Sequence, residues 1–278
     1  MQGLIDLDRY PLDRPGGPGW RRLIDAARAA LADDGMVTLP GFMTPGARDE
    51  TLGLLRPRWK TDAFRHARRH TVYFDPEASG APPGHPVRLE VETVNRTLCA
   101  DQMAGAPLLR LYGSPDLAAF LADALGKPAL YPMRDPLARV NVMRYDVDEA
   151  LNWRFDRSEF TVTLMLQAPE DGGVFEYRRD LRSASDPNFD GVARLLAGAD
   201  PAVGRLTLAP GALNIFLGRN TAHRATPVQG PARAHRRRPV FLRAPGRRLQ
   251  RGGAHRLLRA RRLTPPSQAD EKPLNPRP

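Results

Sequence analysis

The chain contains an aspartate and a histidine whose order could place a carboxylate and an imidazole on one metal ion. Asp156 lies in the run Asn152–Glu159, just before an expected strand. His223 comes much later, after another expected strand at Ala212–Leu217. Two imidazoles and one carboxylate on one side of a metal ion leave the opposite positions open, and this ligand set suits iron(II) and oxygen chemistry. The position two residues before the aspartate, where a first imidazole would stand, is Arg154.

Arg154 cannot replace that imidazole, because a guanidinium stays protonated and has no lone pair for a metal ion. It could instead form an ion pair with Asp156. Taken singly, Asp156 could equally be a loop or capping carboxylate, and His223 a core or surface histidine. The chain has only six histidines, so few substitutes for His223 exist. The order of the two residues in a strand-rich chain favours both as metal ligands.

The part of the chain that positions Asp156 and His223 is expected to consist mainly of strands. From Leu137 onward the apolar residues follow strand periodicity, with turns at Glu170–Gly173 and Ala209–Gly211 and one helical insert at Asn188–Ala197. We therefore predict a mainly β fold with flanking helices, built as a sandwich or a barrel. The expected strands are Val140–Tyr145, Phe160–Gln167, Val174–Tyr177, Arg205–Leu208, Ala212–Leu217 and Ala222–Val228.

Helices are expected before these strands. Apolar residues at helical spacing between Trp20 and Leu31 end at Gly35, and a short strand follows at Met36–Pro40. Thr44 followed by Pro45 begins a second helix, because threonine caps a helix and proline suits its first turn.

The pair Ser114 and Pro115 repeats this start signal for a third helix, which Gly126 closes. Residues 75–90 are rich in Pro, Gly and Ala and are expected to form a loop. The basic run Arg65–His70 could meet an anionic ligand, but we interpret it as a solvated helix face and place no site there.

Three stretches of the sequence resemble the bacterial iron(II)/2-oxoglutarate amino-acid halogenases and their hydroxylase relatives. These stretches are Arg139–Tyr145, Asn152–Phe160 and Gly218–Arg224. That family has histidine at the position of Arg154, and its hydroxylases keep a metal carboxylate at the position of Asp156, where its halogenases have a small residue. The resemblance therefore implies a mainly β fold with flanking helices of the double-stranded β-helix (jelly-roll) type. It also implies a hydroxylase-type site, with Asp156 and His223 as catalytic metal ligands and iron(II) and 2-oxoglutarate as cofactors. It covers most of the chain up to about Pro231.

The same resemblance implies that one face of an expected strand lines the 2-oxoglutarate pocket. From this face we predict Asn141 and Tyr145 as cofactor-binding residues, although its side chains could equally be ordinary core and rim residues. The family also has an arginine for the co-substrate beyond the distal histidine, and Arg233, ten residues after His223, is the nearest candidate. The residues that share the strand face by alternation are Arg139, Asn141, Met143 and Tyr145.

The formal charge of +11 comes from one end of the chain. Residues 232–278 contain thirteen Arg and Lys272 against Asp270 and Glu271, which leaves 28 basic and 29 acidic residues before them. We therefore predict a single oxygenase-like jelly-roll domain with N-terminal helices at residues 1–231 and an Arg/Pro-rich, atypical tail at residues 232–278. The single Cys99 cannot form an intramolecular disulfide, and no signal-peptide pattern or long apolar stretch occurs. We expect a cytoplasmic protein without a membrane partner.

The tail raises two further hypotheses. Ala234–Pro239 has neither alternation nor β-propensity, so we expect the final strand to be missing and the barrel to be unfinished. A shifted reading frame would explain this, because the codons permitted for His235–Leu249, read one base later, can encode an apolar strand like that of the family. A gene sequence with no one-base discrepancy against intact relatives would exclude it.

The other hypothesis is an arginine-rich arm that contacts nucleic-acid phosphates. Phe241 is the tail's only aromatic residue, so base stacking has little support and we do not expect nucleic-acid binding. The expected function is hydroxylation of a small-molecule substrate, such as an amino acid, with weak or absent turnover. The alternative is a catalytically silent protein that keeps its pocket for a ligand.

Overall fold

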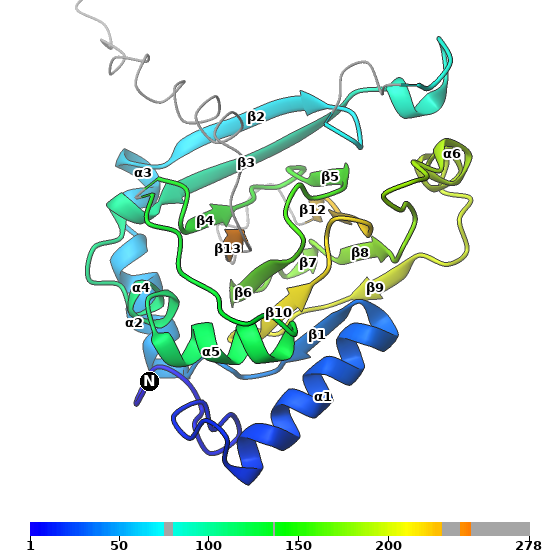
Figure 1. The fold of residues 1–278 in the computed structure, drawn as a ribbon. Coiled ribbons are helices and arrows are strands. Elements are labelled where there is room, and N and C mark those ends of the chain that lie inside the picture. Colours follow the sequence, from blue (N-terminus) through cyan, green and yellow to red (C-terminus); the bar gives the residue numbers. More distant parts are fainter. Residues whose placement is uncertain (75–79, 136, 230–239, 246–278) are drawn as a thin grey trace, which may run out of the picture. The chain divides into compact units, whose positions relative to one another are not determined.

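Antiparallel sheets form the centre of the fold (Figure 1). The computed structural model describes residues 1–74, 80–135 and 137–229, and the backbone of residues 240–245. In spatial order, the seven-stranded sheet contains β1 (Met36–Leu39), β10 (Leu213–Phe216), β6 (Thr161–Gln167), β13 (Val240–Pro245), β4 (Asn141–Arg144), β3 (Val91–Cys99) and β2 (Phe64–His70). The four-stranded sheet contains β5 (Leu151–Arg154), β11 (Ala222–Ala225), β8 (Phe175–Arg178) and β9 (Gly204–Leu206), and β7 (Asp171–Gly172) pairs with β12 (Val228–Gln229).

Helices accompany the strands, and their predicted start and stop signals are confirmed. The Thr44 hydroxyl accepts a hydrogen bond from the Ala47 N–H (3.3 Å), and the Ser114 hydroxyl accepts one from the Asp116 N–H (3.2 Å). Gly35 ends the first helix with φ of 70°, a left-handed conformation that suits glycine. The helices are α1 (Pro18–Asp34), α2 (Pro45–Leu55), α3 (Arg58–Thr61), η1 (Pro86–Arg88), η2 (Ala100–Gln102), α4 (Pro107–Tyr112), α5 (Pro115–Ala124) and α6 (Phe189–Leu196).

The main core lies between the helices and one face of the seven-stranded sheet (Figure 1). Val142, Leu164 and Ile215, on β4, β6 and β10, are buried there beside apolar side chains of α1 and α5. Burying one such side chain stabilises the fold by about 1.5–3 kcal/mol. Because side chains alternate along a strand, their neighbours Thr163 and Asn214 face the other side of the sheet. That second face is lined with polar side chains.

The basic run Arg65–His70 belongs to a strand, so the predicted solvated helix face is wrong. β2 pairs with β3 over its whole length, from Phe64 opposite Thr97 to His70 opposite Val91. His66, Arg68 and His70 are partly or fully buried, whereas the residues between them are exposed. The sequence hid this alternation because basic residues occupy both faces of the strand.

A strand also forms where the final strand was expected to be missing, so that expectation is wrong. β13 pairs with β4 on one side and with β6 on the other. The residues before it lack β-propensity, but Val240, Phe241 and Leu242 are residue types that favour strands. Both neighbouring strands offer backbone donors and acceptors to them.

The described residues all belong to one compact unit. The predicted boundary at residue 231 and the shifted reading frame remain hypotheses. Within the described ranges, no helix is both long and apolar enough to cross a bilayer.

Candidate functional site

The structure brings the three predicted residues of the metal motif together. Arg154 on β5 is directly opposite His223 on β11, so their side chains lie on the same side of the four-stranded sheet. Trp153 and Phe155 point the other way, into a separate apolar cluster. Asp156 therefore follows the end of β5 on the side of Arg154 and His223.

Both carboxylate oxygens of Asp156 have close neighbours. Oδ1 lies 3.5 Å from His223 Nε2 and 3.7 Å from Arg154 Nε. Oδ2 accepts a hydrogen bond from the Thr161 hydroxyl (2.6 Å). Arg154, Asp156 and His223 are only 5%, 2% and 1% exposed, so the charges of Arg154 and Asp156 act in a medium less polar than water.

Gly218 allows this packing around the carboxylate. Its carbonyl oxygen accepts the backbone N–H of Asp156 (2.8 Å). A Cβ atom at residue 218 would lie 2.7 Å from Asp156 Oδ2 and 3.0 Å from the Phe216 ring. Any larger residue would therefore push the carboxylate out of position.

The His223 ring is held in one orientation. Its Nδ1 lies 3.1 Å from the Thr221 carbonyl oxygen, and its ring stacks on Phe175 and meets the edge of Phe216. Burial lowers the pKa of His223 more than the nearby Asp156 carboxylate raises it, and Arg154 lowers it further. The ring is therefore neutral, its Nδ1 proton lies on Thr221, and the Nε2 lone pair faces Asp156.

Asp156 and His223 alone would suit a metal ion, but the complete set does not. Two donors that are each about 2.1 Å from a shared ion lie roughly 3.0–3.4 Å apart, close to the observed separation. The third position holds the Arg154 guanidinium, which cannot donate a lone pair and would repel a divalent cation. Among the described residues, no group of three His, Cys, Asp or Glu side chains could hold a metal ion. The residues present therefore do not fit iron(II) in the expected ligand set.

Asn141 on β4 and Tyr145, which directly follows β4, lie on the same inward face by alternation. Asn141 accepts a hydrogen bond from the Cys99 thiol (3.5 Å) and donates one to the Ala138 carbonyl (3.4 Å). Tyr145 is buried, and it packs with Leu151 of the four-stranded sheet. A cofactor role for Asn141 and Tyr145 remains a prediction. Arg233 lies outside the described residues.

Sequence reasoning missed three residues of this polar interior. Thr161 holds the carboxylate of Asp156, and Gly218 leaves room for it. Asn214 is fully buried, and within the described part of the chain its Nδ2 has no hydrogen-bond partner. Alternation along β6 and β10 could have indicated Thr161 and Asn214 as inward polar residues, but no local pattern indicates Gly218.

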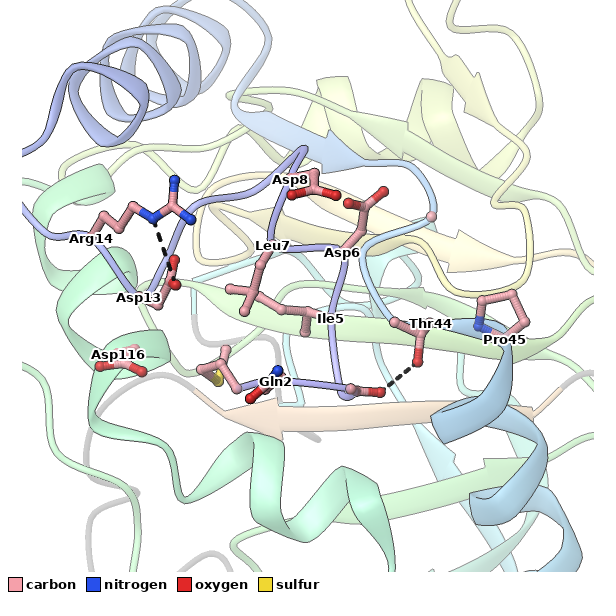
Figure 2. Close-up of a pocket in the computed structure, with 13 residues that line it drawn as sticks. Gln2, Ile5, Asp6, Leu7, Asp8, Asp13, Arg14, Thr44, Pro45 and Asp116 are labelled. Atoms are coloured by element: carbon pink, nitrogen blue, oxygen red, sulfur yellow. Dashed lines mark hydrogen bonds and ion pairs between the residues drawn. The ribbon is translucent and has the colours of Figure 1, made fainter.

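A pocket of about 840 Å³ lies elsewhere, beside the N-terminal segment (Figure 2). Asp6, Asp8, Asp13 and Asp116 line it, and Arg14 pairs with Asp13 at 3.8 Å. None of the candidate ligands is among its lining residues. It is therefore separate from the site described above.

Comparisons with known proteins support the fold. No protein-family model and no curated protein sequence matches the chain. Among solved structures, it is similar to the epimerase SnoN in complex with Fe3+, alpha ketoglutarate and nogalamycin RO, with 17% identity and a TM-score of 0.53. The match covers 92% of this chain and 94% of that one. SnoN is described as a non-heme, alpha ketoglutarate-dependent epimerase from nogalamycin biosynthesis.

Two prolyl hydroxylases are also similar. The prolyl-4-hydroxylase of Pseudomonas putida has 14% identity and a TM-score of 0.51, over 81% of this chain and 100% of that one. The prolyl hydroxylase of Trichoplax adhaerens, solved with a peptide fragment of hypoxia inducible factor, has 10% identity and a TM-score of 0.50. That match covers 82% of this chain and 90% of the other. The chain therefore has the predicted fold, a mainly β double-stranded β-helix with flanking helices.

Proposed function

We propose that the chain is an iron(II)/2-oxoglutarate-dependent oxygenase by descent, of the amino-acid halogenase and hydroxylase branch, whose hydroxylation of a small molecule is impaired. The descent is supported by the shared fold and by the convergence of Asp156 and His223. The impairment is supported by one observation, the buried Arg154 guanidinium 3.7 Å from Asp156 Oδ1 and directly opposite His223. A permanent positive charge at this position opposes a second cation beside the same carboxylate.

Metal binding by Arg154→His tests this proposal, because histidine supplies the missing imidazole. Loss of a partner outside the first ligand shell already weakens metal binding by about 10–100-fold, so a regained ligand should tighten iron(II) binding by at least about 100-fold. The binding is measured by anaerobic titration of the purified protein. Arg154→Lys is the matched control, because it keeps a cation at this position and should remain as weak as wild type.

Turnover is measured on the same proteins as succinate formed from 2-oxoglutarate. We expect no succinate from wild type or Arg154→Lys, and a measurable amount from Arg154→His. Tight iron binding and steady succinate formation by wild type would overturn the proposal.

A second candidate is a non-catalytic protein that binds a small ligand between its sheets. It is supported by Asn214 Nδ2, a buried donor without a hydrogen-bond partner among the described residues, and by the polar residues around it. Burial of such a group costs about 1–3 kcal/mol unless a ligand or a water molecule accepts a hydrogen bond from it. A ligand that raises the melting temperature equally with and without a metal chelator would favour this function. Stabilisation that depends on added iron would count against it.

A further inference from the structure

A group of basic side chains lies beside the candidate site and takes no part in the metal motif. Arg68 and His70 belong to the inward face of β2, and Arg157 directly follows Asp156. All three meet at the ring of Phe74. We call these four residues, Arg68, His70, Phe74 and Arg157, the Phe74 cluster.

The Phe74 ring carries two guanidinium groups. The Cζ atoms of Arg68 and Arg157 lie 5.0 and 5.9 Å from its centroid, and the His70 ring centroid lies 4.6 Å away. Each cation is attracted to the aromatic face, but the two like charges repel each other. Arg157 lowers the pKa of Arg68, after the larger effect of burial. The arrangement therefore concentrates positive charge at one ring.

The backbone at Phe74 is held in an unusual conformation. Phe74 has φ of 58°, in the left-handed region that bulky residues rarely adopt. The Thr71 carbonyl oxygen accepts its N–H (3.0 Å) and lies 2.9 Å from His70 Nδ1. Such strain persists where surrounding contacts impose it and is frequent at ligand-binding sites.

The charge of the cluster is not balanced by nearby carboxylates. Across residues 1–74, 80–135 and 137–229, neither Arg68 nor Arg157 forms an ion pair. The neighbouring Glu90 pairs with Arg69 on the outer face of β2, and Glu159 pairs with Lys127. Asp156 is already engaged by Arg154.

A further guanidinium adds positive charge on the Phe155 side of Asp156. The Arg182 Cζ lies 4.0 Å from the Phe155 ring centroid, and its Nε donates to the Arg219 carbonyl (2.8 Å). Within the described ranges it also has no ion-pair partner. Arg182 therefore adds a second positive charge that acts on the Asp156 carboxylate.

We propose, building on the ligand-binding function above, that the Phe74 cluster binds the anionic group of the small-molecule ligand. Guanidinium groups form strong, charge-assisted hydrogen bonds with oxyanions such as carboxylate or phosphate. An oxyanion at this ring would offset the repulsion between Arg68 and Arg157. The ligand would then extend from the cluster toward the polar interior at Asp156 and Asn214.

Two simple anions, acetate and inorganic phosphate, test the proposal and separate a carboxylate from a phosphate group. NMR titration follows the backbone amides of Phe74 and Arg157 and the Nε–H signals of the arginines. We expect saturable shifts with at least one of the two anions, and none with chloride at the same ionic strength. Absence of saturable shifts with both anions would overturn the proposal.

Substitutions of single arginines test whether the anion binds at the Phe74 cluster. Arg157→Gln and Arg68→Gln should each lower the affinity for the anion by roughly tenfold, because each removes a charge-assisted hydrogen bond. Arg157 is exposed, so its replacement leaves the fold intact. Arg65→Gln is the matched control, because Arg65 lies exposed on the outer face of the same strand, and it should change the affinity less than about twofold. An equal loss in Arg65→Gln and Arg157→Gln would also overturn the proposal.

Different results would rule out anion binding at the Phe74 cluster, the oxygenase descent and the ligand-binding function. Absence of anion binding, while Arg154→His still gains iron, leaves the oxygenase descent standing. A neutral ligand that stabilises the metal-free protein without touching Phe74 leaves the ligand-binding function standing. Tight iron binding by wild type overturns the impairment whatever the anions do.

Discussion

Arg154 and Asp156 form a buried pair whose members depend on each other. Removal of one partner from a buried ion pair takes a compensating charge away from the other partner in a medium of low polarity, at a cost of about 3–5 kcal/mol. Arg154→Met should therefore lower the free energy of unfolding by about 3 kcal/mol, as measured by urea denaturation.

Two comparisons check this explanation. Adding Asp156→Asn to Arg154→Met should restore part of the stability, because the carboxylate charge that Arg154 stabilised is then gone. Arg14→Met removes an exposed pair with Asp13 and should cost less than about 1 kcal/mol. If both arginine variants lose the same stability, the buried pair is not the cause.

His70 makes the stability of the protein depend on pH. Its Nδ1 lies 2.9 Å from the Thr71 carbonyl oxygen and its Nε2 lies 2.8 Å from the Thr93 hydroxyl, which also accepts a hydrogen bond from the Asn152 N–H. Burial is the largest influence on the pKa of His70 and lowers it, so the folded state takes up a proton less readily than the unfolded state. The free energy of unfolding should therefore fall as the pH drops below about 6.5, the unfolded value.

Urea unfolding at several pH values between 7.5 and 5 measures this slope. His66 and His223 also have a pKa lowered mainly by burial, so His70→Gln should flatten the slope without abolishing it. An identical slope in wild type and His70→Gln would exclude a contribution from His70.

At the scale of elements, the helices were predictable because their signals are local. Thr44 and Gly35 act through the backbone of their own helix, so their residue types suffice. β2 was missed because its inward face carries His66 and Arg68 instead of apolar residues. Polar residues on this face of β2 line the polar interior, which forms only when strands far apart in the sequence come together.

The candidate site shows the same division between local and distant information. The convergence of Asp156 and His223 followed from a motif and a strand order that the sequence contains. Gly218 contacts Asp156 only after segments far apart in the sequence have come together, so its role appears only in the structure.

A substitution in β13 would show how much the seven-stranded sheet depends on this strand, which lies between β4 and β6. Leu242 is paired with Val142 of β4 and with Leu164 of β6. Proline has no N–H to donate and is rare within central strands, so Leu242→Pro should destabilise the protein by at least about 3 kcal/mol. Leu242→Val keeps the N–H and the strand propensity, and should fold normally.

Hydrogen exchange measures the effect in the two neighbouring strands. The amides of β4 and β6 should lose protection in Leu242→Pro but not in Leu242→Val. Unchanged protection in the proline variant would show that the sheet does not need this strand.

At the scale of the whole molecule, the excess positive charge lies after residue 231. Residues 249–278 contain six arginines and Lys272. We expect the full chain and a chain ending at Arg248 to bind duplex DNA equally weakly at physiological salt, with Kd no tighter than about 10⁻⁶ M. Fluorescence anisotropy measures this, and tighter binding by the full chain that weakens steeply with salt would indicate an arginine-rich arm.

The position of β13 affects how the protein is made. The ribosome synthesises β4 and β6 long before β13, yet the last strand inserts between them. During translation each nascent chain therefore exposes two open strand edges, which can pair with the edges of other chains. A chaperone that shields these edges until β13 has been made should therefore raise the yield of folded protein more than any change to the finished surface.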